Sequence, residues 1–189
     1  QNESDVAFKV DEKVIPAHKQ VLVKKSRYFE GLFKSGMAES TQDIIEIKDC
    51  EYKIFKEFLR WIYQGTMSLN EANQAIKLHV LADKYLQDDL REKCLNFLTS
   101  ILNMENVYTI LDFAHQENRI YLKSWCKKLF QDKLTIDNVT GLIRYLLDRQ
   151  EDPESKENNT GFRNQALNFV LDNFFEIHDN ENGNIQLYE

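Results

Sequence analysis

The sequence predicts a mostly helical α+β protein, in which a small sheet flanked by helices is followed by a run of further helices. The 189 residues include only six Gly and two Pro, too few for a chain of many tight β-turns. Near the N-terminus, apolar residues alternate with period two, as in a half-buried strand. After Asp49 they recur at spacings of three and four residues, as on amphipathic helices.

The first fifty residues contain the predicted strands. Alternation at positions 6–10 predicts the first strand. Its partner is expected at positions 13–15, where Pro16 ends the strand because proline has no N–H to donate to a sheet. A third strand is expected at positions 43–47. Together these strands form the small sheet.

Two short helices are expected between the second and third strands, at about positions 18–25 and 28–34. Ser26 belongs to the residue types that cap helix N-termini, and it is expected to begin the second of these helices. Gly36 is expected to end it, because glycine readily adopts the left-handed backbone angles that follow many helices. His18 is expected to cap or pack against the turn after the second strand.

Longer helices follow. An apolar stripe at positions 54–62 predicts a helix that Gly65 ends. Positions 68–71 read Ser-Leu-Asn-Glu, the pattern of a capping box, which is expected to open the next helix. That helix carries apolar residues on more than one face, Val80 among them, which predicts deep burial. A further stripe covers positions 90–101.

The last ninety residues show the pattern of two helical pairs. Trp125 belongs to the second of their four apolar stripes. A stretch rich in acidic and amide residues at positions 150–161 is expected to be an exposed loop. The four stripes lie at positions 107–114, 122–130, 136–147 and 162–174.

The composition limits the partners and the compartment. A formal net charge of −7 argues against nucleic-acid or membrane-surface binding, because those partners require a basic face. Three cysteines, Cys50, Cys94 and Cys126, without a CxxC pair argue against a disulfide framework or a zinc site. We therefore expect an intracellular protein, cytoplasmic or nuclear, with reduced thiols and no metal or cofactor.

Several segments of the first hundred residues resemble the BTB/POZ family. They occur in the order and at the spacing of that family, so no single motif carries the resemblance. The segments are SDV at 4–6, PAHKQVL at 16–22, SRYF at 26–29, GMAES at 36–40, IEI at 45–47, FKEFL at 55–59, IYQG at 62–65, and LADKYL at 81–86, continuing through Leu90 to Cys94. The resemblance implies a BTB/POZ fold and a protein-interaction module.

The remainder resembles a BACK-type helical extension, in which certain residues recur at fixed places. We therefore expect a BTB/POZ domain at residues 1–100, a BACK-like helical extension at residues 101–178 and a polar tail at residues 179–189. The residues that carry this resemblance are Asn106, Phe113, Ala114, Leu122 and Cys126.

The BTB/POZ resemblance implies an adaptor that bridges a BTB-specific cullin-RING ubiquitin ligase scaffold to a substrate. The contact signature of such adaptors is a hydrophobic residue, any residue and then Glu after the second short helix, and Met37, Ala38 and Glu39 fit it. A flexible Met side chain can fill an apolar notch, and a carboxylate can set orientation. By the same resemblance, Tyr63 and Tyr85 lie near this surface. The alternative is that Met37 and the tyrosines pack inside the domain while Glu39 is solvated.

Asp5 and Lys19 stand where dimeric members carry an acidic and a basic residue that form a charged pocket at the interface. The resemblance therefore implies a homodimer or heterodimer. The alternative is a local ion pair that ties the first strand to the first helix. The chain begins at the first strand, without the additional N-terminal helix that many dimeric members exchange, which weighs against the swapped arrangement.

The sequence carries no catalytic motif of the common enzyme classes. It has no GxSxG, Gly-rich phosphate loop or HExxH motif. His115 and Cys126 lie on neighbouring predicted helices and could meet, the minimum for a thiol nucleophile, but such stripe positions usually belong to the core. We expect no enzymatic activity. The alternative to the adaptor is a structural oligomerisation module in a larger complex, with no ubiquitin role.

Overall fold

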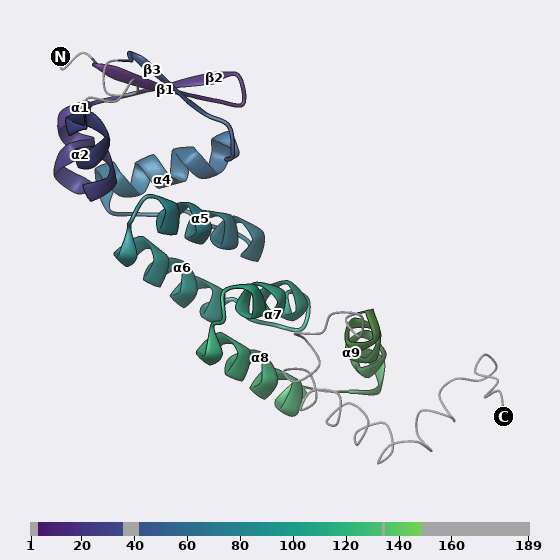
Figure 1. The fold of residues 1–189 in the computed structure, drawn as a ribbon. Helices are drawn as coiled ribbons and strands as arrows, with labels where there is room; N and C mark the ends of the chain where they lie inside the picture. Colours follow the sequence, from purple (N-terminus) through teal and green to yellow (C-terminus); the bar gives the residue numbers. More distant parts are fainter. Residues whose placement is uncertain (1–3, 36–41, 134, 149–189) are drawn as a thin grey trace. The chain divides into compact units, whose positions relative to one another are not determined.

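The structure is a computed structural model that describes residues 4–35, 42–133 and 135–148 (Figure 1). The chain divides into two compact units, Gln1–Ile101 and Leu102–Glu189. The mostly helical α+β class predicted from the sequence is confirmed. The elements of the first unit are β1 (Val6–Val10), β2 (Lys13–Ala17), α1 (Lys19–Lys25), α2 (Arg27–Lys34), β3 (Ile44–Ile47), α4 (Tyr52–Gln64), α5 (Ala72–Lys84) and α6 (Asp88–Ser100). The described elements of the second unit are α7 (Val107–Gln116), α8 (Ile120–Lys133) and α9 (Ile136–Asp148).

The three strands form one sheet in the order β2-β1-β3, with β1 in the centre. β1 pairs antiparallel with β2 and parallel with β3, so that Phe8 lies between Ile15 and Ile45. β2 continues through Pro16 to Ala17, and the prediction that Pro16 ends the strand is wrong. An edge strand tolerates proline because one row of its backbone groups faces no partner strand.

The inner face of the sheet and the surrounding helices enclose the core of the first unit. The alternating residues of β1 are buried as predicted, as are Ile45 and Ile47 of β3. Figure 1 shows α4 beneath the sheet, with α1 and α2 beside it. Four phenylalanines from the sheet and from two helices are essentially buried: Phe8, Phe29, Phe55 and Phe58. Buried aromatic rings supply much of the hydrophobic stabilisation of a small domain.

Two of the predicted helix ends lie at Ser26 and Gly65 in the structure. Ser26 stands between α1 and α2 as expected, and its backbone carbonyl accepts a hydrogen bond of 2.9 Å from the N–H of Glu30. Its buried hydroxyl nevertheless makes no capping hydrogen bond among the described residues. Gly65 ends α4 in a left-handed conformation with φ 70°, which confirms the prediction. Gly36 lies outside the described residues.

The start and the burial of α5 differ from the predictions. The helix begins at Ala72, so the residues at 68–71 do not act as its capping box. The N–H of Ser68 donates instead to the Glu57 carboxylate on α4, at 3.0 Å, so a tertiary hydrogen bond holds this residue. Val80 is exposed rather than buried because it borders a hollow, whereas its neighbour Leu81 is buried.

In the second unit, α7 buries the predicted stripe, including Ile110 and Ala114. α8 buries Leu122, Cys126 and Phe130, but Trp125 is exposed, which corrects its assignment to the buried stripe. The buried residues recur every four positions, and Trp125 lies about 100° around the helix from this row.

Val139 and Leu142 of α9 are buried. The predicted loop at 150–161, the predicted helix at 162–174 and the predicted polar tail lie outside the described residues. Within the part of the chain that is described, no helix combines the length and the apolar content needed to cross a membrane.

Candidate functional site

The predicted cullin signature, Met37, Ala38 and Glu39, lies outside the described residues. The elements that precede and follow it are anchored in the core through buried side chains, Phe29 of α2 and Ile45 of β3. The role of the three signature residues stays a prediction.

Tyr63, which is predicted to lie near the cullin-binding surface, is near the C-terminal end of α4 and is 38% exposed. Its hydroxyl accepts a hydrogen bond of 2.8 Å from the backbone N–H of His18 and lies 3.0 Å from Nδ1 of the same residue. Burial raises the pKa of Tyr63, partly offset by the His18 N–H. The pair ties the residue before α1 to the end of α4 and leaves part of the Tyr63 side chain exposed.

Tyr85 has a different environment, since it is 2% exposed. Its ring centroid lies 4.6 Å from that of Tyr28, 4.9 Å from that of Phe58 and 5.4 Å from that of Phe29. Burial raises the pKa of Tyr85 above its ordinary value. Of the two interpretations of this residue, core packing agrees with its position in the structure.

Asp5 contacts Lys19 through the backbone of that residue. Asp5 Oδ1 accepts a hydrogen bond of 2.7 Å from the backbone N–H of Lys19, the first residue of α1. A carboxylate at this point satisfies a donor that has no partner within its helix and complements the helix dipole. The Lys19 ammonium lies 5.5 Å from the centroid of the Phe33 ring. This geometry matches a local tie between β1 and α1, while the role in a dimer stays a prediction.

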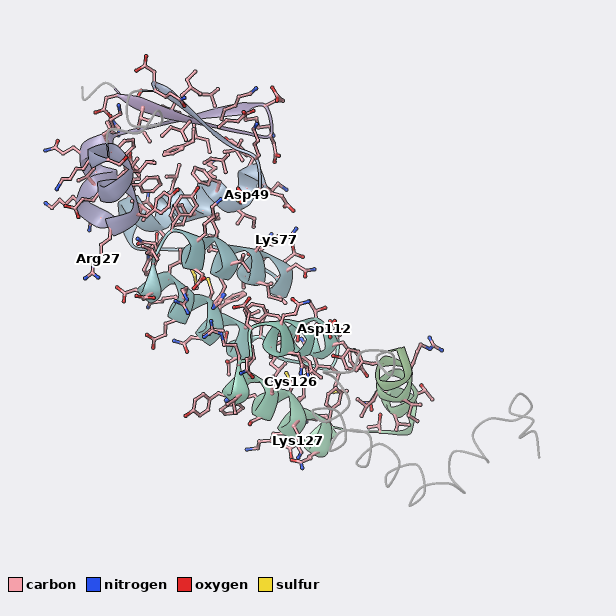
Figure 2. The ribbon with its side chains drawn as sticks, viewed as in Figure 1. Arg27, Asp49, Lys77, Asp112, Cys126 and Lys127 are labelled. Atoms are coloured by element: carbon pink, nitrogen blue, oxygen red, sulfur yellow. The ribbon has the colours of Figure 1, made fainter. Side chains whose placement is uncertain are left out.

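The three thiols are held in their protonated form. Burial raises the pKa of Cys50 to about 11, and those of Cys94 and Cys126 to about 12 each. Cys126, labelled in Figure 2, is therefore not the thiolate that a nucleophile requires at neutral pH. Among the described residues, no group of three His, Cys, Asp or Glu side chains is arranged to hold a metal ion.

A hollow of about 430 Å³ lies between the start of α4 and α5. Its rim carries charges of both signs, and Figure 2 labels Asp49 and Lys77 among them. Lys84 pairs with Asp49 at 2.6 Å, and Lys77 pairs with Glu51. These ion pairs join α5 to the segment before α4, so the charges of this hollow are balanced within the domain.

A groove of about 760 Å³ follows the outer side of α4, and we refer to it as the α4 groove. Lys53, Lys56 and Arg60 line it from α4, while Ile15 of β2 and Leu69 of the next segment line it from other elements. None of these residues is marked as a binding residue by a motif in the sequence. The available signal was the polar face of the helix, on which the cations recur at spacings of three and four.

The outward side of α8, which we call the α8 outer face, exposes large apolar side chains. Ile120, Tyr121 and Trp125 are 67%, 85% and 51% exposed. The Lys128 ammonium lies 5.9 Å from the centroid of the Trp125 ring. Exposed aromatic residues beside a cation are typical of protein-binding surfaces.

Grooves and exposed apolar faces of this kind are features of protein-interaction modules. Residues 1–102 match the family model for the BTB/POZ domain. The chain belongs to the BTB/POZ domain family. Members of this family are in general interaction modules rather than enzymes.

Similar proteins share more than the BTB/POZ segment with this chain. BTB/POZ domain-containing protein 9 of Drosophila melanogaster is 38% identical over 132 residues, which cover 69% of this chain and 18% of that protein. A BTB/POZ domain-containing protein of Arabidopsis thaliana is 32% identical over 139 residues, which cover 74% of this chain and 56% of that protein. Among solved structures, the BTB domain of zebrafish PATZ1 matches with a TM-score of 0.44 and 27% identity, over 51% of this chain and 76% of that chain.

Proposed function

We propose that the chain is an adaptor that bridges the BTB-specific cullin of a cullin-RING ubiquitin ligase to a substrate. The observation that carries this proposal is the signature Met37, Ala38 and Glu39 in a chain that belongs to the BTB/POZ family. Met37 supplies an adaptable apolar contact, and Glu39 supplies an orienting charge. The exposed side of Tyr63 extends the surface, and the buried Tyr85 holds the neighbouring helices in position.

A titration of the 189-residue chain against the N-terminal region of the BTB-specific cullin tests this proposal. We expect a Kd in the micromolar range or below, with binding abolished by Met37→Arg and by Glu39→Arg. The matched control is Val14→Arg, which adds the same charge at an exposed apolar position on β2. This control should bind as the wild type does.

Absence of binding at tens of micromolar would overturn the adaptor proposal. So would equal losses in Met37→Arg and Val14→Arg, because the effect would then come from added charge alone. Melting curves for each variant separate lost contacts from lost folding.

The second candidate is a structural assembly module without a ubiquitin role. The α8 outer face favours it, since large exposed aromatic side chains are the kind of anchors that dominate protein interfaces. This candidate predicts that Trp125→Ala removes a neighbour from the native complex while cullin binding is absent. Crosslinking of the wild type and of the variant in cell extracts, with identification of the linked proteins, distinguishes the two candidates.

We further propose a dimer contact at Asp5 and Lys19. The pair lies at the start of α1, where a charge on a second chain can replace or extend the local hydrogen bond. Light scattering over a range of concentrations should give twice the chain mass for the wild type and a monomer for Asp5→Lys. A monomer in both would remove this proposal.

The organisation of the whole chain completes the proposal. We infer a BTB/POZ domain at residues 1–100, a BACK-like extension at residues 101–178 and a polar tail at residues 179–189, in an intracellular protein of the cytoplasm or nucleus. The helical pair α7 and α8 supports the extension. Limited proteolysis should cut first in the tail and next near residue 101.

A further inference from the structure

The α4 groove differs in charge from the chain as a whole. Lys53, Lys56 and Arg60 stand at positions i, i+3 and i+7 of α4, which places them on one side of the helix. Glu57 is the single carboxylate among the lining residues, against these three cations. The chain as a whole has a net charge of −7. The groove is therefore a local basic site on an acidic protein.

The carboxylate in the groove is already engaged. Glu57 Oε1 accepts a hydrogen bond from Arg60 at 3.2 Å, and Glu57 Oε2 accepts one from the backbone N–H of Ser68 at 3.0 Å. Within the described residues, the ammonium groups of Lys53 and Lys56 enter no ion pair. The two lysines are thus available to a ligand, and Arg60 has further N–H donors beyond the one that Glu57 uses.

The chemistry of the other walls limits what the ligand is. Ile15, Pro16 and Leu69 give the groove apolar surface, and the side-chain amides of Gln64 and Gln74 lie among its polar residues. Apolar surface contributes nothing to a free phosphate or to a sugar-phosphate backbone, but it binds an aliphatic side chain. The Oε1 atoms of these amides accept hydrogen bonds from Thr66 and from the N–H of Asn70, and their NH2 groups can donate to the C=O groups of an extended main chain. A volume of about 760 Å³ is within the range of ligand-binding sites.

We propose that the α4 groove docks an extended acidic segment of a partner protein, with its carboxylates facing the cations of α4 and an aliphatic side chain against the apolar walls. This site goes beyond the cullin contact and contains none of the three signature residues, although Tyr63, which we place at the edge of the cullin surface, also lines the groove. It would give the chain a second partner, recognised through charge and one apolar anchor.

The spacing of the cations predicts the spacing of the acids. Lys56 and Arg60 are four residues apart, which is about 6 Å along a helix with a rise of 1.5 Å per residue. Side chains at positions i and i+2 of an extended peptide lie on the same side and are about 6.8 Å apart. The groove therefore fits two acidic residues separated by one aliphatic residue, and Lys53 is in position for a third acid.

The test is fluorescence anisotropy with the full chain and the labelled peptide Glu-Leu-Glu-Val-Glu-Leu. We expect saturable binding, and a Kd that rises at least about tenfold in the double variant Lys53→Glu, Lys56→Glu. The matched control is Lys24→Glu, Lys25→Glu, which changes the net charge equally at exposed positions of α1. Its Kd should stay within about twofold of the wild type. The peptide with Gln in place of Glu should bind at least about tenfold more weakly.

Three outcomes would overturn the proposal. The first is no saturable binding at peptide concentrations up to about 1 mM. The second is an equal loss in the two lysine double variants, which would indicate attraction to overall charge. The third is competition by a hexathymidine oligonucleotide as strong as that by the unlabelled peptide, which would indicate a general polyanion site.

The peptide site and the cullin contact are separable in the same assay. Met37→Arg should leave the peptide Kd unchanged, and Lys53→Glu, Lys56→Glu should leave cullin binding unchanged. If the lysine variant instead alters the mass of the free chain in light scattering, the groove is a contact between copies, and the partner-peptide proposal is wrong.

Discussion

Phe29 of α2 and two aromatic residues of α8, Tyr121 and Trp125, have opposite environments, although Phe130 of α8 is buried. Phe29 of α2 is buried, and its ring centroid lies 5.6 Å from that of Phe8 and 5.4 Å from that of Tyr85. Tyr121 and Trp125 of α8 are exposed. Burial makes Phe29 a source of folding stability, whereas the exposed rings of Tyr121 and Trp125 contribute little to it and leave apolar area uncovered. An aromatic side chain therefore stabilises the fold where it is enclosed, and where it is exposed it leaves a surface for the binding role proposed above.

The largest effect that tests this comparison is the removal of a buried ring. Phe29→Ala should lower the free energy of unfolding by about 3–5 kcal/mol, because it leaves a cavity among rings that cannot fully close around it. Urea unfolding followed by circular dichroism measures the change. The control Tyr121→Ala should change it by less than about 0.5 kcal/mol. Similar losses in both variants would break the comparison.

The buried cysteines, one in each unit, test whether both cores exclude water alike. The folded pKa of Cys94 and of Cys126 is about 12, above the ordinary value of 9.0. A raised folded pKa gives stability that is fully present below about pH 9 and is lost as the pH rises toward 12. Each thiol should therefore cost about 1 kcal/mol between pH 7 and pH 10.

Unfolding of Cys94→Ala and of Cys126→Ala at the two pH values measures this loss. Each variant should lose less stability than the wild type over that interval, because the cavity it creates does not depend on pH. A variant that loses as much as the wild type would show that its thiol is hydrated in the folded state.

Tyr63 is intermediate between the buried Phe29 and the exposed aromatic residues of α8. Its side chain is partly exposed, while its hydroxyl is hydrogen-bonded to His18. Tyr63→Phe should cost about 1 kcal/mol, because the His18 N–H loses its acceptor. The control Tyr121→Phe should cost nothing measurable by urea unfolding, since that side chain is largely in solvent. Equal values for the two variants would mean that water replaces the lost hydroxyl of Tyr63.

The smallest expected effect on stability is at Trp125. Trp125→Ala should shift the unfolding free energy by less than about 0.5 kcal/mol, because the ring is half in solvent. A loss above about 2 kcal/mol would show that the Trp125 ring is buried in solution, as the Phe29 ring is, and would contradict the comparison. Differential scanning calorimetry at two protein concentrations also reveals any self-association through this face.

Elements that depend on local periodicity were predicted well. The alternation in β1, the apolar stripe of α4 and its end at Gly65 all appear in the structure. Two predicted boundaries, at Pro16 and at the residues 68–71, were wrong for a tertiary reason. Pro16 is tolerated because β2 is an edge strand. Ser68 is hydrogen-bonded to Glu57 and does not cap the helix that follows it.

Residues of the candidate sites could be predicted from the sequence only where they match a family motif or recur at a regular spacing. Asp5 accepts a hydrogen bond from the backbone N–H of Lys19, and Met37, Ala38 and Glu39 lie outside the described residues. The hydrogen bond between His18 and Tyr63 joins residues 45 positions apart, which no local pattern reveals. The lysines of the α4 groove had a visible spacing, but the walls opposite them come from other elements.

By itself, the sequence determined which residues alternate, which helices are amphipathic, where Gly65 ends α4 and that the first hundred residues resemble a BTB/POZ domain. These properties follow from side-chain spacing and backbone preference within one or two turns. Only the tertiary structure decided the parallel pairing of β3 with β1, the burial of Tyr85 and the exposure of Trp125. The physical reason is that the spacing of apolar residues shows which face of an element is buried. Contacts between distant parts of the chain decide which other element packs against that face.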